Sequence, residues 1–264
     1  MTLDHLLTAL PPRILIGSAG WNLPRAEQAE FPEAGSHLER YASRFEAVEI
    51  NSSFHRPHRP TTYARWSASV PASFRFSVKV PKTITHGLRL QHAGELLDTF
   101  LVEVAGLGDK LGCFLVQLPP SLAFEPDVAA DFFADLRSRS AAPLACEPRH
   151  ASWFEPSAGD LLRDLEVARV AADPARVPEA GEPGGWRGMS YYRLHGSPRM
   201  YYSAYSEEYI DALASQVRTD AAAGREVWCI FDNTTLGAAT RNALDLRSRL
   251  QEQRQARQAA GQAP

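Results

Sequence analysis

The chain has 264 residues, of which 44% are hydrophobic and 22% are charged, a balance typical of an ordinary globular protein with ample core. Its formal net charge of -3 argues against a broad, non-specific nucleic-acid surface, although a local basic pocket for an anion stays open. No run approaches the roughly 18 apolar residues that a membrane span needs. The opening residues lack the basic region of a signal peptide.

Three cysteines, Cys113, Cys146 and Cys229, fall in separate apolar runs and show no zinc-binding spacing. We therefore expect them to be small buried hydrophobic residues, as in proteins of a reducing compartment. The sequence predicts a cytoplasmic protein with no membrane partner. It gives no indication of the oligomeric state.

Eight short apolar runs follow one another along the chain, and long helical patterns separate most of them. They cover residues 13–17, 47–51, 74–80, 112–118, 144–147, 168–173, 191–196 and 227–233. Strands that alternate with helices predict repeated βαβ units and a parallel sheet. Eight such units predict an α/β fold, a single (β/α)8 TIM-like barrel over residues 1–250, followed by a polar, frayed tail at 251–264.

Local signals mark some of the connections between these runs. Ser36 and Glu39 form a capping-box pattern, which predicts that a helix begins after Ser36. Residues 174–188 are rich in Pro and Gly where a crossover helix is expected. We therefore predict that this helix is short or missing.

Alternation within the second and third runs predicts which side chains face the barrel interior. Glu49 and Asn51 share one face of their strand, opposite Val48 and Ile50. In the third run, Phe and Val side chains form the outer face, which leaves Lys79 inward.

Most runs end in polar or ionisable residues, and the active sites of (β/α)8 barrels lie at the C-terminal ends of the strands. We therefore expect these residues to converge on one mouth. The candidate catalytic residues are Glu147, His150, His195 and Glu49. The candidate substrate-binding residues are Trp21, Asn51, Lys79, His86, Gln117, Arg149, Arg193, Asp232 and Asn233.

Glu49 and Glu147 are predicted on strands across the barrel from each other. Two carboxylates that face one cavity can act as acid and base, because burial and mutual repulsion separate their pKa values. The alternative is that a neighbouring Arg or Lys pairs with each carboxylate in a buried salt-bridge network.

Basic groups accompany these carboxylates. Arg149 and His150 lie close after Glu147. Arg149 suits anion binding and His150 suits proton transfer, or else both hold the loop in place through hydrogen bonds. Arg193 and His195 share the inward face of their strand and need anionic partners there. Those partners are either nearby carboxylates such as Glu147 and Asp232, or a substrate anion.

Other candidates have equally open alternatives. Lys79 suits a Schiff base or, more simply, an ion pair. His86 lies on a polar loop where it could bind an anion, and Trp21 could stack on a ligand ring or pack the barrel rim. Asn51, Gln117 and Asn233 could orient a polar ligand or satisfy backbone groups.

No metal or other cofactor is predicted. A divalent metal remains an alternative, because the candidate site contains carboxylates and histidines that could ligate one. These residues are Glu49, Glu147, His150, His195 and Asp232. However, the chain has no HxH, HExxH or DxD spacing, and basic side chains would crowd a cation. The chain has no GxGxxG, Walker A or GxSxG pattern. We therefore do not predict a dinucleotide-binding protein, a nucleoside-triphosphatase or a serine hydrolase.

Seven segments, in order, resemble the YecE-like family, also called domain of unknown function 72. They are GSAGW (17–21), VEINSSFHRP (48–57), FRFSVKVPKTITH (74–86), LGCFLVQLPPS (111–121), CEPRHASW (146–153), YYRLHG (191–196) and FDNTTLGAATRNAL (231–244). The resemblance implies a TIM-like barrel and brings no assigned reaction. The chain departs from the family at Ser52-Ser53-Phe54-His55, where an aromatic pair, Phe-Tyr, is usual, and at Asp232, where Asn is common.

Two functions fit these observations. The preferred one is an enzyme for a small polar or anionic substrate, such as a sugar, phosphate ester or carboxylate. Glutamate and histidine would move protons, and Arg and Lys would hold the negative charge. The alternative is a non-catalytic module that binds a nucleotide or a nucleic-acid end, although a nucleic-acid partner is not favoured by the net charge.

Overall fold

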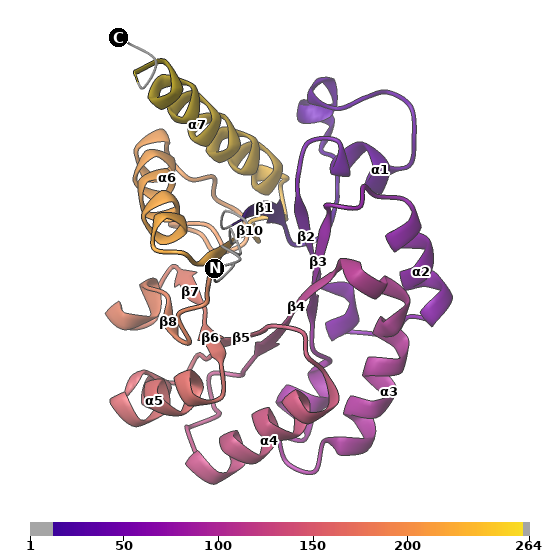
Figure 1. The fold of residues 1–264 in the computed structure, drawn as a ribbon, viewed down its shortest axis with the longest axis vertical. Coiled ribbons are helices and arrows are strands. Elements are labelled where there is room, and N and C mark those ends of the chain that lie inside the picture. The colour runs from indigo at the N-terminus through magenta and orange to yellow at the C-terminus, as the bar shows by residue number, and fades with distance from the viewer. Residues whose placement is uncertain (1–12, 261–264) are drawn as a thin grey trace, which may run out of the picture.

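The structure is a computed structural model that describes residues 13–260. Its strands are β1 (Ile14–Ser18), β2 (Ala47–Ile50), β3 (Arg75–Lys79), β4 (Leu111–Gln117), β5 (Leu144–Glu147), β6 (Val167–Arg169), β7 (Ala171–Asp173), β8 (Gly184–Gly185), β9 (Met189–Leu194) and β10 (Glu226–Phe231). Its α-helices are α1 (His37–Ala42), α2 (Pro60–Ala68), α3 (Gly94–Val104), α4 (Pro126–Arg139), α5 (Pro156–Asp164), α6 (Glu207–Ala222) and α7 (Ala238–Ala260). Figure 1 shows the strands at the centre, with the helices around them.

The strands form two sheets. One sheet has the order β1-β10-β9-β7, and the other has the order β2-β3-β4-β5-β6-β8. All the pairings are parallel except β6 with β8. The fold is therefore mixed α/β with parallel sheets, and every predicted apolar run contains a strand.

The hydrogen-bond ladders of the described residues do not close into the single barrel that we expected from the sequence. The sixth predicted strand is divided at Val170: β6 before it pairs with β5, and β7 after it pairs with β9. At the other junction between the sheets, only an isolated bridge joins Ala19 to Glu49. The chain thus changes sheets within 168–173, and a closed barrel is not confirmed.

The segment predicted to lack a crossover helix contains a 3-10 helix at Pro178–Gly181 and the two-residue strand β8. Residues 174–188 are all described, and none of them is in an α-helix. Closely spaced Pro and Gly residues explain this, because both are poor in helix interiors.

The predicted frayed tail at 251–264 overlaps the last helix. Helix α7 continues to Ala260, and residues 261–264 lie outside the described part of the chain. The start of α1 agrees with prediction: the Ser36 side chain accepts from the amide of Glu39, and the Glu39 carboxylate accepts from the amide of Ser36.

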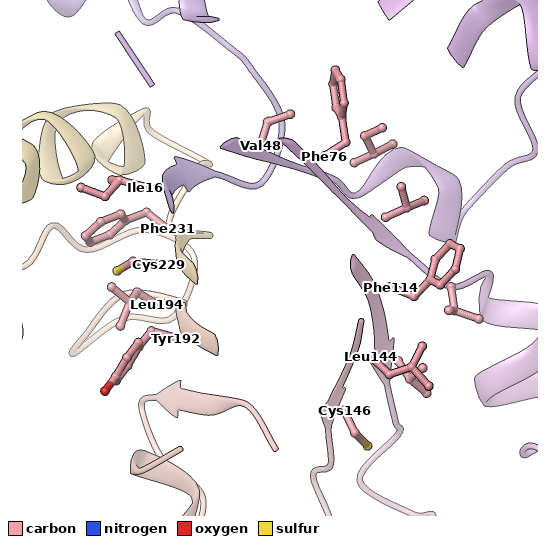
Figure 2. Packing of buried hydrophobic residues seen from close by; sticks show 14 of the residues in the cluster. Ile16, Val48, Phe76, Phe114, Leu144, Cys146, Tyr192, Leu194, Cys229 and Phe231 are labelled. Atoms are coloured by element: carbon pink, nitrogen blue, oxygen red, sulfur yellow. The ribbon is translucent and has the colours of Figure 1, made fainter. Parts of the chain in front are cut away.

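Two apolar clusters lie on opposite faces of the strands. The larger one packs the sheets against the helices and includes Val48 and Ile50, as the alternation predicts. Figure 2 shows side chains of this cluster, such as Phe76 and Phe114, directed away from the strands. The smaller one includes Leu115 and Trp228, which alternate with residues of the larger cluster along their strands. It fills the inner face below the polar strand ends.

Within the described residues, no helix combines the length and the apolar character needed to cross a membrane.

Substituting Ala for Gly17 tests the close approach of the two sheets. A Cβ atom at Gly17 would collide with the backbone carbonyl of Ala47 on β2. We predict that Gly17→Ala lowers the free energy of unfolding in urea by about 1–3 kcal/mol, the usual cost of overpacking.

Gly159→Ala is the matched control. Gly159 lies inside α5, and a Cβ atom there meets nothing within 4 Å. This substitution should raise the free energy of unfolding by about 0.5–1 kcal/mol, because Ala is the better helix former. Equal effects at both positions would contradict the tight β1–β2 junction.

Candidate functional site

Arg193, on β9, lies at the centre of the polar strand ends. Its Nε and Nη2 atoms donate to the two oxygens of Glu49 on β2, at 3.0 and 2.8 Å. Its Nη1 atom donates to Glu147 Oε2 on β5 at 2.9 Å, and Nη2 lies 2.9 Å from Asp232 Oδ2. The side chain is only 1% exposed, so one buried guanidinium neutralises carboxylates from both sheets.

His195 joins the same carboxylates from the other side. Its Nε2 atom lies 3.2 Å from Glu147 Oε1, and its Nδ1 atom lies 3.0 Å from Asp232 Oδ2. Arg149 completes the arrangement, since its Nε and Nη2 atoms donate to Glu147 Oε1 at 3.0 and 2.9 Å. We call these six residues the central ion network: Glu49, Glu147, Arg149, Arg193, His195 and Asp232.

The pKa values of the network follow from these contacts. Burial alone would raise the pKa of Glu147, but Arg193, His195 and Arg149 outweigh it and hold that pKa well below 4.5. The pKa of Asp232 is lowered in the same way, by Arg193 and His195 against burial. Burial would lower the pKa of His195, yet Glu147 and Asp232 raise it above 6.5.

The central ion network is therefore balanced in charge. Three carboxylates face two guanidiniums and one imidazole, so the sum is zero when His195 is protonated. This arrangement favours the interpretation in which these groups pair with one another. It disfavours Glu147 as a general acid at neutral pH, because its low pKa keeps it ionised.

Tyr191 supports the network from below, although it is not among the site residues predicted from the sequence. Its hydroxyl donates to Glu49 Oε2 at 3.0 Å and lies 2.9 Å from Ser77 Oγ. The signal was present, because Tyr191 lies two residues before Arg193 on the same strand face.

Lys79, at the end of β3, differs from the network residues. It is 5% exposed, and among the residues that the structure describes its ammonium has no ion pair or hydrogen bond. Its Nζ atom lies 4.0 Å from the ring centre of Phe54. Burial and the charge of Arg193 lower the pKa of Lys79 to about 8, against the opposing attraction of Glu49, Glu147 and Asp232. The ion pair suggested by the sequence is thus replaced by a cation–π contact.

A basic groove lies on the outer side of Phe54. Its volume is about 510 Å³, and its lining is Phe54, His55, Lys82, Thr83, His86 and Gly87. His86, in a π-helix at Thr83–Gly87, packs its ring edge-on to Phe54 at 5.1 Å. Burial, Lys79, Lys82 and Arg149 all lower the pKa of His86, so several cations converge here.

Trp21 and Asn51 line a separate cavity of about 420 Å³ beside the ends of β1 and β2. Trp21 meets Trp66 of α2 edge-to-face, with ring centres 5.0 Å apart. Trp66 also meets His58, at 5.1 Å. Trp66 could not be singled out from the sequence, because a tryptophan in a helix is usually a core residue.

The remaining candidates have structural contacts. His150 Nδ1 accepts from the amide of Ser152 and caps a 3-10 helix at Ala151–Phe154, outside the central ion network. Asn233 Nδ2 donates to the carbonyl of Ser203 at 2.8 Å, which fixes the loop after β9. Gln117 is buried opposite Glu147 in the sheet.

The space beside the network is small. A cavity next to Glu147, Arg149 and His195 holds about 20 Å³, roughly the space of one water molecule. Among the described residues, no group of three or more His, Cys, Asp and Glu side chains is arranged to hold a metal ion.

Replacing Arg193 tests whether it neutralises the buried carboxylates. Arg193→Met leaves Glu49, Glu147 and Asp232 without their shared cation, so we predict a loss of about 3–5 kcal/mol in the free energy of unfolding at pH 7. Arg193→Lys, which keeps the positive charge, should retain part of the stability that Arg193→Met loses. Arg163→Met, at a surface position, should change stability by no more than about 0.5 kcal/mol. A small effect of Arg193→Met would refute the proposed role.

The pH dependence of stability tests His195. Because its pKa is raised above 6.5 in the folded protein, its charge contributes stability that is fully present below pH 6.5 and lost as pH rises through the folded pKa. The difference in unfolding free energy between wild type and His195→Gln should therefore be larger at about pH 6 than at about pH 9. A difference that is independent of pH would mean that folding does not raise the pKa of His195.

The family of the chain follows from comparison with known proteins. The sequence profile described as "Protein of unknown function DUF72" matches residues 15–264. The UPF0759 protein YecE of Escherichia coli (strain K12) is 32% identical over 106 residues, which are 40% of this chain and 38% of that protein. The UPF0759 protein YunF of Bacillus subtilis (strain 168) is 27% identical over 149 residues, or 54% and 53% of the two chains. The alignments thus span about two fifths and about half of these relatives.

Solved structures of DUF72 proteins resemble the fold of this chain. A DUF72 family protein from Thermotoga maritima MSB8 has a TM-score of 0.75 at 23% identity, over 90% of this chain and 99% of that one. Another, from Enterococcus faecalis V583, has a TM-score of 0.75 at 22% identity, over 90% and 95%. The profile match covers nearly the whole sequence, and with it the residues of the central ion network: this chain belongs to the DUF72 family of proteins of unknown function.

Proposed function

We propose that the protein is an enzyme that binds a small anionic molecule in the basic groove, at the C-terminal ends of its strands. The observation that carries this proposal is the unpaired ammonium of Lys79. A buried charge without a partner costs free energy, so such a group is usually retained for something other than stability. A negatively charged ligand would supply the missing partner.

The charge balance of the central ion network supports this proposal. The three carboxylates are already matched by Arg149, Arg193 and His195, so they leave the charge of Lys79 in excess. Lys82 and His86 line the groove on the other side of Phe54. A ligand anion there would contact Lys82 and His86 directly. Its electrostatic attraction to Lys79 would act through the protein interior, where charges are weakly screened.

The chemistry in this proposal is proton transfer. His86 lines the groove, and burial, Lys79, Lys82 and Arg149 lower its pKa, so a neutral imidazole is available there to accept a proton from the ligand. Glu147, His195 and Glu49 act by holding Arg149 and Arg193 in place, in contrast to the acid–base roles expected from the sequence. His150 contributes through the loop that it caps.

The same proposal includes a TIM-like barrel in which the two sheets are two parts of one ring. The Ala19–Glu49 bridge at one junction supports this, and so does the continuous chain at the other, where β6 pairs with β5 and β7, one residue further on, pairs with β9. A location in the cytoplasm is supported by three buried free cysteines.

A second candidate is a binding module without catalysis. The cavity of about 20 Å³ beside Glu147 and His195 favours it, because an enzyme usually encloses its substrate in a pocket of some hundreds of cubic ångströms. Turnover of a bound ligand that depends on His86 would separate the two candidates.

Replacing Lys79 by Met tests the anion site. We predict that Lys79→Met weakens binding of inorganic phosphate and of small phosphate esters by about tenfold, measured by calorimetry at pH 7. The same change should raise the free energy of unfolding without ligand, because it removes an unpaired buried charge. Arg163→Met should leave both quantities unchanged. Unaltered phosphate affinity in Lys79→Met would refute the proposal.

The pH dependence of binding gives an independent check. Lys79 loses its charge as pH rises through about 8, so phosphate affinity in the wild type should fall between about pH 7 and pH 9. In Lys79→Met this fall should be absent, because phosphate only gains negative charge as pH rises over this range. A parallel decline in both proteins would assign the titration to another group.

A further inference from the structure

The cavity beside the ends of β1 and β2 has a lining unlike that of the basic groove. We call it the Trp21 groove, and the residues used below are Trp21, Asn51, Ser52, Arg56, His58 and Trp66. It combines indole and imidazole rings with an amide, a hydroxyl and a guanidinium. Its volume of about 420 Å³ is within the range of small-molecule sites.

Asn51 is the unusual member of this lining. It precedes the 3-10 helix at Ser52–Phe54, yet its side chain makes no capping hydrogen bond. Its Oδ1 atom is buried and has no hydrogen-bond partner among the described residues. No protein contact therefore fixes the amide, which can turn to present its acceptor or its donors to a ligand. An unsatisfied amide of this kind costs stability unless a ligand satisfies it.

The aromatic side chains offer one ring face rather than two. Trp21 and Trp66 are inclined at 73°, and His58 and Trp66 at 72°. Edge-to-face packing leaves no parallel pair between which a flat aromatic ring could be sandwiched. The negative face of a single indole instead suits the weakly positive C–H groups on one side of a saturated ring.

The polar residues complement such a ring. His58 Nε2 is hydrogen-bonded to Ser52 Oγ at 2.8 Å, and burial and Arg56 lower the pKa of His58, which favours the neutral imidazole. These groups and Asn51 can exchange hydrogen bonds with neighbouring hydroxyls. Arg56 is exposed and has no ion pair among the described residues, so it can meet a negative substituent.

From this combination we infer that the Trp21 groove binds the ring of a phosphorylated monosaccharide, with the ring on Trp21, its hydroxyls at Asn51 and His58, and its phosphate at Arg56. The inference rests on the proposed function for the anionic character of the ligand, and it adds the sugar ring. The Trp21 groove and the basic groove lie on either side of residues 52–56, which contribute to the lining of both.

Fluorine NMR of protein labelled with 5-fluorotryptophan tests this inference. The chain has five tryptophans, and the Trp21 and Trp66 resonances can be assigned with Trp21→Phe and Trp66→Phe. The probes are glucose 6-phosphate, mannose 6-phosphate, ribose 5-phosphate, the three free sugars and inorganic phosphate, each titrated to about 10 mM, since single-ring ligands often bind in the millimolar range. Trp153, which is buried and donates to the carbonyl of Leu122, serves as an internal reference.

At least one sugar phosphate should shift the Trp21 resonance saturably while Trp153 stays unchanged. Asn51→Ala should weaken that binding at least about fivefold without lowering the stability of the free protein, because Asn51 has no protein partner to lose. Trp186→Phe, a tryptophan change outside the groove, should bind like wild type.

The inference is overturned if no sugar phosphate moves the Trp21 resonance, or if inorganic phosphate alone moves it equally. It is also overturned if Asn51→Ala binds like wild type. Phosphate binding that still depends on Lys79 would then leave the proposed function standing, so the two failures are distinguishable.

Discussion

Burial of the Arg193 guanidinium is the constraint on which the polar end of the structure depends. A guanidinium keeps its charge at any physiological pH, so inside a protein it needs carboxylates placed to match its planar donors. Glu49 supplies a two-point contact, and Glu147 and Asp232 each contact one further nitrogen–hydrogen group. The positions of all these residues are thereby tied to one another.

This constraint also links the two sheets. Glu49 and Glu147 belong to the sheet that contains β2 and β5, whereas Arg193 belongs to the sheet that contains β9. Direct hydrogen bonds between the sheets are sparse at the β1–β2 junction, where Ala19 and Glu49 form an isolated bridge. The central ion network therefore supplies, through side chains, a connection that the backbone ladders make only weakly. Buried ion pairs often add little to net stability, because removing charges from water costs free energy. The main effect of the network is therefore to fix which side chains face one another.

Much of this arrangement could be predicted from the sequence. Strict alternation in β2, β3 and β9 identifies the inward faces, because period-2 geometry leaves no other choice. The convergence of Glu49, Glu147 and Arg193 follows from parallel strands whose ends share one edge. The outcome of that convergence could not be predicted, because whether a histidine bonds two carboxylates or faces a ligand depends on positions within a few tenths of an ångström.

Tertiary contacts from helices, such as Trp66 against Trp21, leave no periodic pattern in the sequence. The split of the sixth strand at Val170 likewise depends on its two neighbours rather than on its own residues.

Within residues 13–260, the central ion network is complete in itself and leaves Lys79 as a cation without an ion-pair partner. Lys79, Lys82 and Lys110 are the lysines of the chain, so carbon-13 labelling of lysine side chains gives a simple NMR spectrum that can be titrated with pH. We predict one resonance with a pKa of about 8 that disappears in Lys79→Met. If no lysine titrates below about pH 10, the ordinary range for an ammonium in water, then Lys79 is paired with a carboxylate and the claim is wrong.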